Sequence, residues 1–123
     1  MGAPNLHHDV DRENAQWQFL AALCAARLPV PSRIEFCQKT QPSAFADVAC
    51  RTVYEEILAM TKPEKQHPPQ ALRDDLPARV TRRGFPDLDF DMLFSSEDVD
   101  KPEARLARTY EALLASAVRE NKS

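Results

Sequence analysis

The sequence predicts an all-α fold, a compact bundle of four to six helices. Three observations support this class. Apolar residues recur at helical spacing in three long segments, near residues 12–28, 43–60 and 101–118. The ten prolines stand mostly between apolar runs, where they separate one helix from the next. No segment alternates apolar and polar residues for long enough to form a sheet.

The composition is that of a single globular domain. A chain of 123 residues, 43% of them hydrophobic, can bury one core but not two. Residues 1–10 are polar and are predicted to be a flexible leader, so the helical domain is expected to span residues 11–120. The formal net charge of −3 argues against a domain that coats nucleic acid, because such domains are basic. No apolar run is long enough to cross a membrane and no secretory signal is visible, which predicts an intracellular protein with no membrane partner.

The first predicted helix, residues 12–28, is expected at the centre of the bundle. Its apolar side chains cover much more of the circumference than a surface stripe would. One face carries Trp17, Leu20, Ala21, Cys24 and Leu28. Pro29 and Pro31 end this helix, and the connector over residues 32–42 is either a short helical turn or an extended segment.

The second predicted helix begins with Ser43 as its N-cap, since serine is a residue type that caps helix N-termini. It runs to about residue 60. Its apolar face contains Phe45, Val48, Ala49, Val53, Ile57 and Met60. Glu55 and Glu56 are expected on or beside the face that meets water.

A third helical region is predicted over residues 70–83, interrupted or restarted at Pro77. Proline is tolerated in the first turn of a helix because its missing N–H has no partner there. Gly84 can end the helix in a left-handed conformation without a Cβ clash. The side chains expected to face the core are Leu76, Val80 and Phe85.

Two further segments complete the predicted domain. The 88–94 apolar cluster consists of Leu88, Phe90, Leu93 and Phe94. We expect it to be a non-helical clip that packs against the helices, with a docking surface as the alternative. The last helix is expected to begin at Asp100 or Lys101, with Pro102 in its first turn. Its apolar stripe contains Leu106, Tyr110, Leu113, Leu114, Ala117 and Val118.

The three cysteines, Cys24, Cys37 and Cys50, are odd in number. Cys24 and Cys50 lie within apolar helical patterns, where free cysteine behaves as a small buried hydrophobe. Buried thiols in a reducing compartment are therefore favoured over a disulfide.

No cofactor, metal site or catalytic group is predicted, and the chain is not expected to be an enzyme. His7 and His8 have no third metal ligand near them in the sequence. Asp87, Asp89 and Asp91 have the alternate spacing of a calcium loop but lack its glycine and its closing glutamate. Two glycines are too few for a phosphate-binding loop.

A cluster of basic residues is the main candidate for a functional surface. Arg79, Arg82 and Arg83 stand at i, i+3 and i+4 on one helix, so they form a patch. Lys62 and Lys65 lie one connector upstream. This predicted basic face is either a solvated helix surface or a contact for an acidic polymer or protein, which it can steer despite the overall negative charge.

The order of these segments resembles the calponin-homology fold, most closely the divergent NN-CH type of outer-kinetochore and intraflagellar-transport proteins. The resemblance covers residues 16–117. The residues that carry it are Trp17, Phe19, Leu20 and Leu23, then Gln41, Pro42, Ser43, Phe45, Val53 and Tyr54, and finally Leu76, Pro77, Val80, Gly84, Phe85 and Pro86. It implies binding to microtubules, or to a second calponin-homology-like domain, in a kinetochore, centriole or ciliary assembly.

Two functional hypotheses of different classes are open at this point. The first is a non-enzymatic cytoskeletal adaptor, cytoplasmic or cytoskeleton-associated, that contacts tubulin or an assembly partner through the basic face. Microtubule-binding members of the resembled type are basic and this chain is acidic, which shifts weight towards protein docking. The second is a helical protein-interaction domain, a complex subunit or an effector, that docks through the 88–94 apolar cluster and has no polymer affinity. The acidic balance disfavours a nucleic-acid partner.

Overall fold

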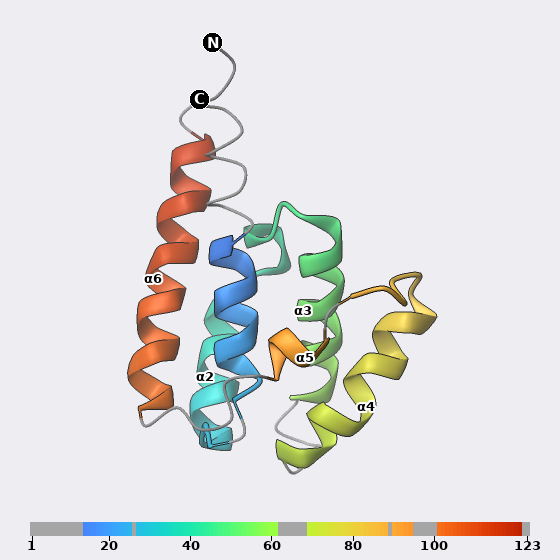
Figure 1. The fold of residues 1–123 in the computed structure, drawn as a ribbon. Helices are drawn as coiled ribbons and strands as arrows, with labels where there is room; N and C mark the ends of the chain where they lie inside the picture. Colours follow the sequence, from blue (N-terminus) through green and yellow to red (C-terminus); the bar gives the residue numbers. More distant parts are fainter. Residues whose placement is uncertain (1–13, 26, 62–68, 89, 95–100, 122–123) are drawn as a thin grey trace.

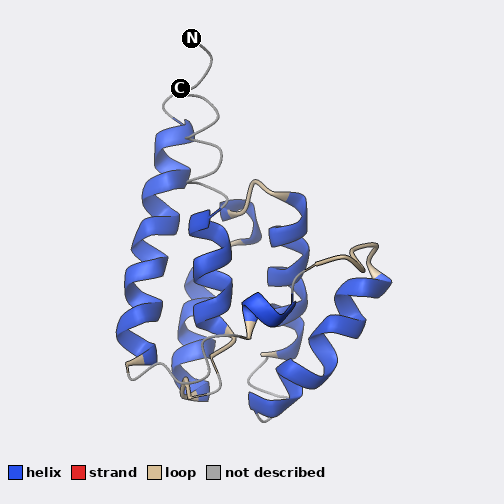
Figure 2. Ribbon diagram, viewed as in Figure 1, coloured by secondary structure: helices blue, strands red, loops and turns tan. Residues whose placement is uncertain are grey.

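The computed structural model describes residues 14–25, 27–61, 69–88, 90–94 and 101–121. Within these ranges the chain forms helices joined by turns and contains no strand, which confirms the predicted all-α class (Figure 2). The helices are a first helix over residues 14–23, α2 (Val30–Lys39), the 3-10 turn η1 (Pro42–Ala44), α3 (Val48–Met60), α4 (Pro69–Arg82), α5 (Phe90–Leu93) and α6 (Pro102–Asn121). The predicted leader, residues 1–10, lies outside the described residues.

The first helix stands in the middle of the bundle, between α6 on one side and α3 on the other, with α4 outside α3 (Figure 1). Every residue from Phe19 to Ala25 is buried, which confirms the expected central helix. The helix ends at residue 23, five residues earlier than predicted. Pro29 and Pro31, which were expected to end the first helix, belong to the start of α2, as its N-cap and in its first turn.

The segment that the sequence left open between a helical turn and an extended strand is the ten-residue helix α2. Arg33, Phe36 and Cys37 are its buried residues, and their spacing of i, i+3 and i+4 places them on one face. Lys39 lies in the last turn, with its Nζ 4.0 Å from the ring centroid of Phe36. The Lys39 Nζ is also 4.8 Å from the ring centroid of Tyr110 on α6, so this cation–π contact links α2 to α6.

The predicted start of the second helix was wrong by several residues. Ser43 lies in η1, and α3 begins at Val48 with Asp47 as its N-cap. The Asp47 carboxylate accepts a hydrogen bond of 3.0 Å from the backbone N–H of Cys50, one of the donors that has no partner inside the helix. The separate η1 turn lets Phe45 enter the core, where it is fully buried.

The sequence allowed a helix that restarts at Pro77. In the structure, Pro77 instead lies inside α4. A proline in a helix interior removes one hydrogen bond and costs about 3 kcal/mol. The helix continues because Leu76 and Val80, on either side of the proline, are completely buried in the core. This packing of α4 against α3 offsets the lost hydrogen bond.

Gly84 ends α4 as predicted, with a φ of +102°. The N–H of Gly84 donates to the carbonyl of Thr81 (3.0 Å), and the N–H of Phe85 donates to the carbonyl of Val80 (3.3 Å). This pair of bonds is a Schellman motif, which satisfies the last carbonyls of the helix and requires a left-handed residue at the glycine.

Replacing Gly84 by alanine is expected to lower the free energy of unfolding by about 1–2 kcal/mol, because the left-handed conformation costs that much for a residue with a Cβ. The space around the glycine is open, so the cost is conformational and not steric. Urea denaturation measures the effect. Gly84→Asn is the control and should lose less, since asparagine tolerates this region; equal losses would contradict the explanation.

The 88–94 apolar cluster packs on the core but is not a non-helical clip, because residues 90–93 form the single turn α5. Leu93 and Phe94 are buried, and Leu88 and Phe90 are half-buried against the same core. The last helix, α6, begins at Pro102, one or two residues after the predicted start, and its residues Leu106 and Leu113 are completely buried.

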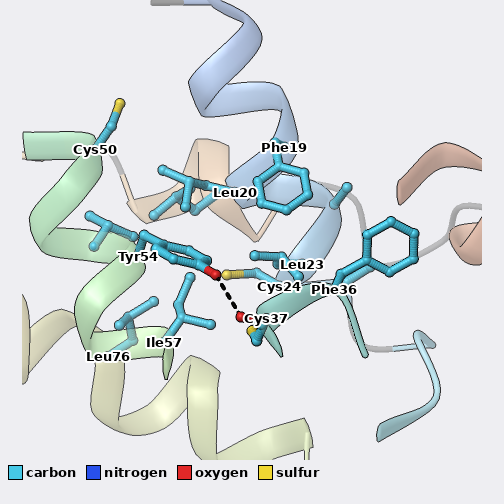
Figure 3. Packing of buried hydrophobic residues seen from close by; sticks show 14 of the residues in the cluster. Phe19, Leu20, Leu23, Cys24, Phe36, Cys37, Cys50, Tyr54, Ile57 and Leu76 are labelled. Atoms are coloured by element: carbon cyan, nitrogen blue, oxygen red, sulfur yellow. Dashed lines mark hydrogen bonds between the residues drawn. The ribbon is translucent and has the colours of Figure 1, made fainter. Parts of the chain in front are cut away.

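The rings of Phe19, Phe45 and Tyr54 join three segments at the centre of the core. Figure 3 shows Phe19 and Tyr54 among the neighbouring buried side chains. The ring centroids of Tyr54 and Phe45 are 4.7 Å apart, and those of Phe19 and Phe45 are 6.1 Å apart. The Tyr54 hydroxyl donates to the backbone carbonyls of Thr40 (2.5 Å) and Cys37 (3.1 Å). The Cys37 carbonyl belongs to the last turn of α2, so Tyr54 supplies a donor that this helix end lacks.

Candidate interaction site

The arginines of the predicted basic face are bound to glutamates of the neighbouring helix. Arg79 Nε lies 3.0 Å from Glu56 Oε1. Arg83 Nη2 lies 2.8 Å from Glu55 Oε1, and Arg83 Nη1 lies 3.0 Å from Glu56 Oε2. We call these four residues the arginine–glutamate cluster. It joins the end of α4 to the second half of α3, and the glutamates hold the pKa of Arg83 above its usual value, mainly through their hydrogen bonds.

The pairing reduces the charge of the predicted face. Counted over the described residues, three arginines, with Arg82 included, stand against two glutamates, which gives a net charge of +1. Arg82 is exposed, and Arg83 keeps 42% of its side-chain surface accessible, whereas Glu56 keeps only 15%. Lys62 and Lys65, the other two predicted members, lie outside the described residues. Arg79 and Arg82 lie in α4 and Arg83 follows it directly. Arg82 and Arg83 are exposed and Arg79 is half-buried, and the glutamates partly neutralise Arg79 and Arg83.

A pocket of about 630 Å³ opens next to the arginine–glutamate cluster, between α2 and α3. Its apolar walls come from Ile34, Pro42, Leu58 and Ala59, all of which are only partly buried. Gln38, Thr61, Glu55 and Arg83 add polar groups, and Cys37 lies on the wall. Glu55 and Arg83 thus belong to both the pocket and the cluster, so the two features form one continuous site.

This pocket was not predicted from the sequence. Ile34 was recognised only as part of an ambiguous connector, and Leu58 lies off the predicted apolar face of the second helix. The sequence does place the apolar residues Leu58 and Ala59 near Glu55 on one helix. They form a pocket only together with the residues that α2 contributes to the lining, and the sequence did not show that α2 lies beside them.

The alternative docking surface does not stand free of the core. Leu93 is completely buried and Phe94 is 9% exposed, so neither presents its ring or branched chain to a partner in this conformation. Leu88 and Phe90 are half-buried against the same core cluster. In the sequence, this cluster was compatible both with a segment that packs against the helices and with a docking surface. The packing of α5 onto the bundle explains the burial.

The three cysteines form no disulfide and are buried, in agreement with the prediction. Burial raises the pKa of Cys24 to about 12 and that of Cys37 to about 11, although the neighbouring guanidinium of Arg33 opposes both shifts. Cys24 and Cys37 therefore stay protonated at neutral pH, so neither carries a ready nucleophilic thiolate.

The raised pKa values predict a loss of stability in alkaline solution. Thiols of the unfolded chain ionise near pH 9, whereas the folded chain keeps Cys24 and Cys37 protonated until about pH 11–12. The folded state therefore holds more protons, and its stability should fall from pH 9 upwards, by up to about 1.4 kcal/mol per pH unit for each thiol. Urea midpoints at pH 7.5, 9 and 10 measure the decline, which should be shallower in Cys24→Ala; an equal slope would contradict this assignment.

Arg33 is a buried cation that sequence reasoning did not single out. Its side chain is 3% exposed, and burial lowers the pKa of its guanidinium. Arg33 Nε donates to the carbonyl of Leu23 (2.8 Å) and Nη2 to the carbonyl of Ala25 (3.2 Å). Leu23 is the last residue of the first helix and Ala25 lies two residues beyond it, so an arginine of α2 supplies donors to carbonyls at this helix end. Its role is structural.

Several other classes of site can be assessed for the described residues alone. Within them, no three His, Cys, Asp or Glu side chains gather to hold a metal ion. Asp87 and Asp91 are exposed, while Asp89 and the His7–His8 pair lie outside the described residues. None of the helices among the described residues combines the length and the apolar character needed to span a bilayer.

Comparison with known protein families, with curated proteins and with solved structures finds no match to this chain. The all-helical architecture is compatible with a compact helical bundle. The calponin-homology resemblance itself stays a prediction.

Proposed function

We propose that this chain is a non-enzymatic helical adaptor domain that binds another protein at the corner formed by the α2–α3 pocket and the arginine–glutamate cluster. The observation that carries the proposal is that a partly exposed apolar pocket adjoins a group of charged side chains. Protein interfaces have this anatomy, with an apolar centre inside a polar rim, and their strongest contacts are side chains seated in pockets.

The wall residue Ala59 allows a sharp test of this surface. Ala59→Glu places a charge in the pocket, whereas Ala112→Glu makes the same change at an exposed position of α6. Proteins retained from a cell extract by the wild-type chain are compared with those retained by each variant. We expect to find a partner that the Ala112→Glu variant retains and the Ala59→Glu variant loses. Once purified, this partner should bind the Ala112→Glu variant more tightly than the Ala59→Glu variant. A partner retained equally by both variants would contradict the proposed surface.

Microtubule binding through the basic face is the second candidate. It is supported by the exposure of Arg82 and Arg83 at the end of α4 and by the resemblance that implies a cytoskeletal setting. The glutamate pairing limits the attraction, so any binding should be weak and sensitive to salt.

Co-sedimentation with microtubules at low ionic strength tests this candidate. Arg82→Glu is the informative variant, because Arg82 lies outside the arginine–glutamate cluster and its reversal leaves that cluster intact. Arg108→Glu, at an exposed position of α6, is the matched control. The candidate predicts sedimentation that Arg82→Glu weakens and Arg108→Glu does not. Equal sedimentation of both variants rules out this face, and no sedimentation of the wild type rules out the activity.

A further inference from the structure

The chemistry of the α2–α3 pocket restricts what a partner can place there. Its volume of about 630 Å³ lies within the range of roughly 300–1,000 Å³ that is typical of ligand pockets. The walls supplied by Ile34, Leu58 and Ala59 offer only apolar atoms from their side chains. A large aliphatic or aromatic side chain can fill the space between these walls, whereas a charged group finds partners only on the polar side of the lining, at Gln38, Thr61, Glu55 and Arg83.

The charged side of the same site has more donors than acceptors. A guanidinium carries five N–H donors. Among the described residues, Arg83 gives two of them to Glu55 and Glu56, and Arg79 gives one to Glu56. With Arg82 beside them, the corner has three positive and two negative charges. Unused donors and a net positive charge both favour carboxylates, which guanidinium groups bind in a forked geometry.

We infer that the partner binds through an acidic segment that inserts one large apolar side chain into the pocket and sets neighbouring carboxylates against Arg83 and Arg82. This inference rests on the proposed function, since it names the chemistry of the partner at that site. Arg83 is the central contact, because it lies on the pocket and in the arginine–glutamate cluster at once. The apolar side chain supplies affinity, and the carboxylates fix the orientation of the segment.

Selection of short random peptides displayed on phage, on the full chain, tests the inference without a known partner. Sequences that also bind Ala59→Glu are removed. We expect the enriched peptides to share a Leu, Phe or Trp flanked by Asp or Glu. Enriched peptides that lack acidic residues, or an absence of pocket-dependent peptides, would overturn the inference.

Affinity measurements on a synthetic copy of the most enriched peptide give the second test. Arg83→Met should weaken binding about tenfold or more, because it leaves the peptide carboxylate without its partner. Arg108→Met, at an exposed site on α6, should leave the affinity unchanged. Unfolding in urea verifies that both variants are folded. Equal affinities for the two variants would overturn the inference, whereas the proposed function falls only if partner retention is independent of Ala59.

Discussion

Replacement of Tyr54 by alanine should remove about 3–5 kcal/mol from the free energy of unfolding, the range for loss of a buried aromatic side chain. Tyr54 is completely buried and contacts the rings of Phe45 and Phe19. Its hydroxyl also holds the carbonyls of Cys37 and Thr40 at the end of α2. Since small domains have only about 5–15 kcal/mol of stability, this variant should be unfolded in part or in full at 37 °C.

Tyr54→Phe separates the two contributions of this residue. It keeps the ring and removes the hydroxyl, so the two carbonyls lose a buried donor at a cost of about 1–3 kcal/mol. Urea denaturation followed by circular dichroism measures both variants. Val48→Ala is the control, because Val48 is 63% exposed and its truncation should change little. A Tyr54→Phe variant as stable as the wild type would show that the hydroxyl contributes nothing.

Arg33→Met is the second substitution with a large expected effect. Methionine fills similar space but donates no hydrogen bonds, so the carbonyls of Leu23 and Ala25 are left without the Arg33 donors. We expect a loss of about 2–4 kcal/mol, within the range for unsatisfied buried groups. The cost should exceed the gain from no longer burying the charge, because the guanidinium supplies donors to two carbonyls at once.

Arg33→Lys and Arg27→Met serve as controls for this prediction. Lysine keeps the charge but cannot span two carbonyls with a planar fork, so it should also destabilise the domain. Arg27 is exposed in the same connection between the first helix and α2, and its replacement should change the unfolding midpoint little. If Arg33→Met is as stable as the wild type, the buried charge costs as much as its hydrogen bonds contribute.

The helices with strong periodicity were predicted well. The first helix was expected at the centre because its apolar residues exceed one face, and Phe19 to Ala25 are indeed buried. The left-handed Gly84 was predicted from its position after α4, and it has the expected positive φ. These features depend on local preferences, which neighbouring residues in the sequence determine.

The boundaries and the connectors were predicted less well. Ser43 and Asp47 are both residues that cap helices, and only the burial of Phe45 decides that Asp47 does so. Pro77 looked like a helix start because a proline inside a helix is costly, and the packing of Leu76 and Val80 reverses that preference. Long-range packing outweighs local propensity at these positions.

The candidate site, too, was predicted only in part. The arginine patch was predicted from the spacing of Arg79, Arg82 and Arg83, but its neutralisation by Glu55 and Glu56 was not. Sequence separations of 23 and 28 residues join these partners. The periodicity of one helix does not show which charged residues of another helix its side chains will pair with.

The sequence by itself determined the helical class, the central first helix, the glycine stop of α4 and the buried thiols, because each depends on residue type and spacing within one segment. Only the tertiary structure decided how the charges and cavities are arranged. It sets Arg33 against the end of the first helix, Tyr54 against the end of α2, and the arginines of α4 against the glutamates of α3. The α2–α3 pocket exists because two helices meet there, and a surface made by two segments depends on how they pack.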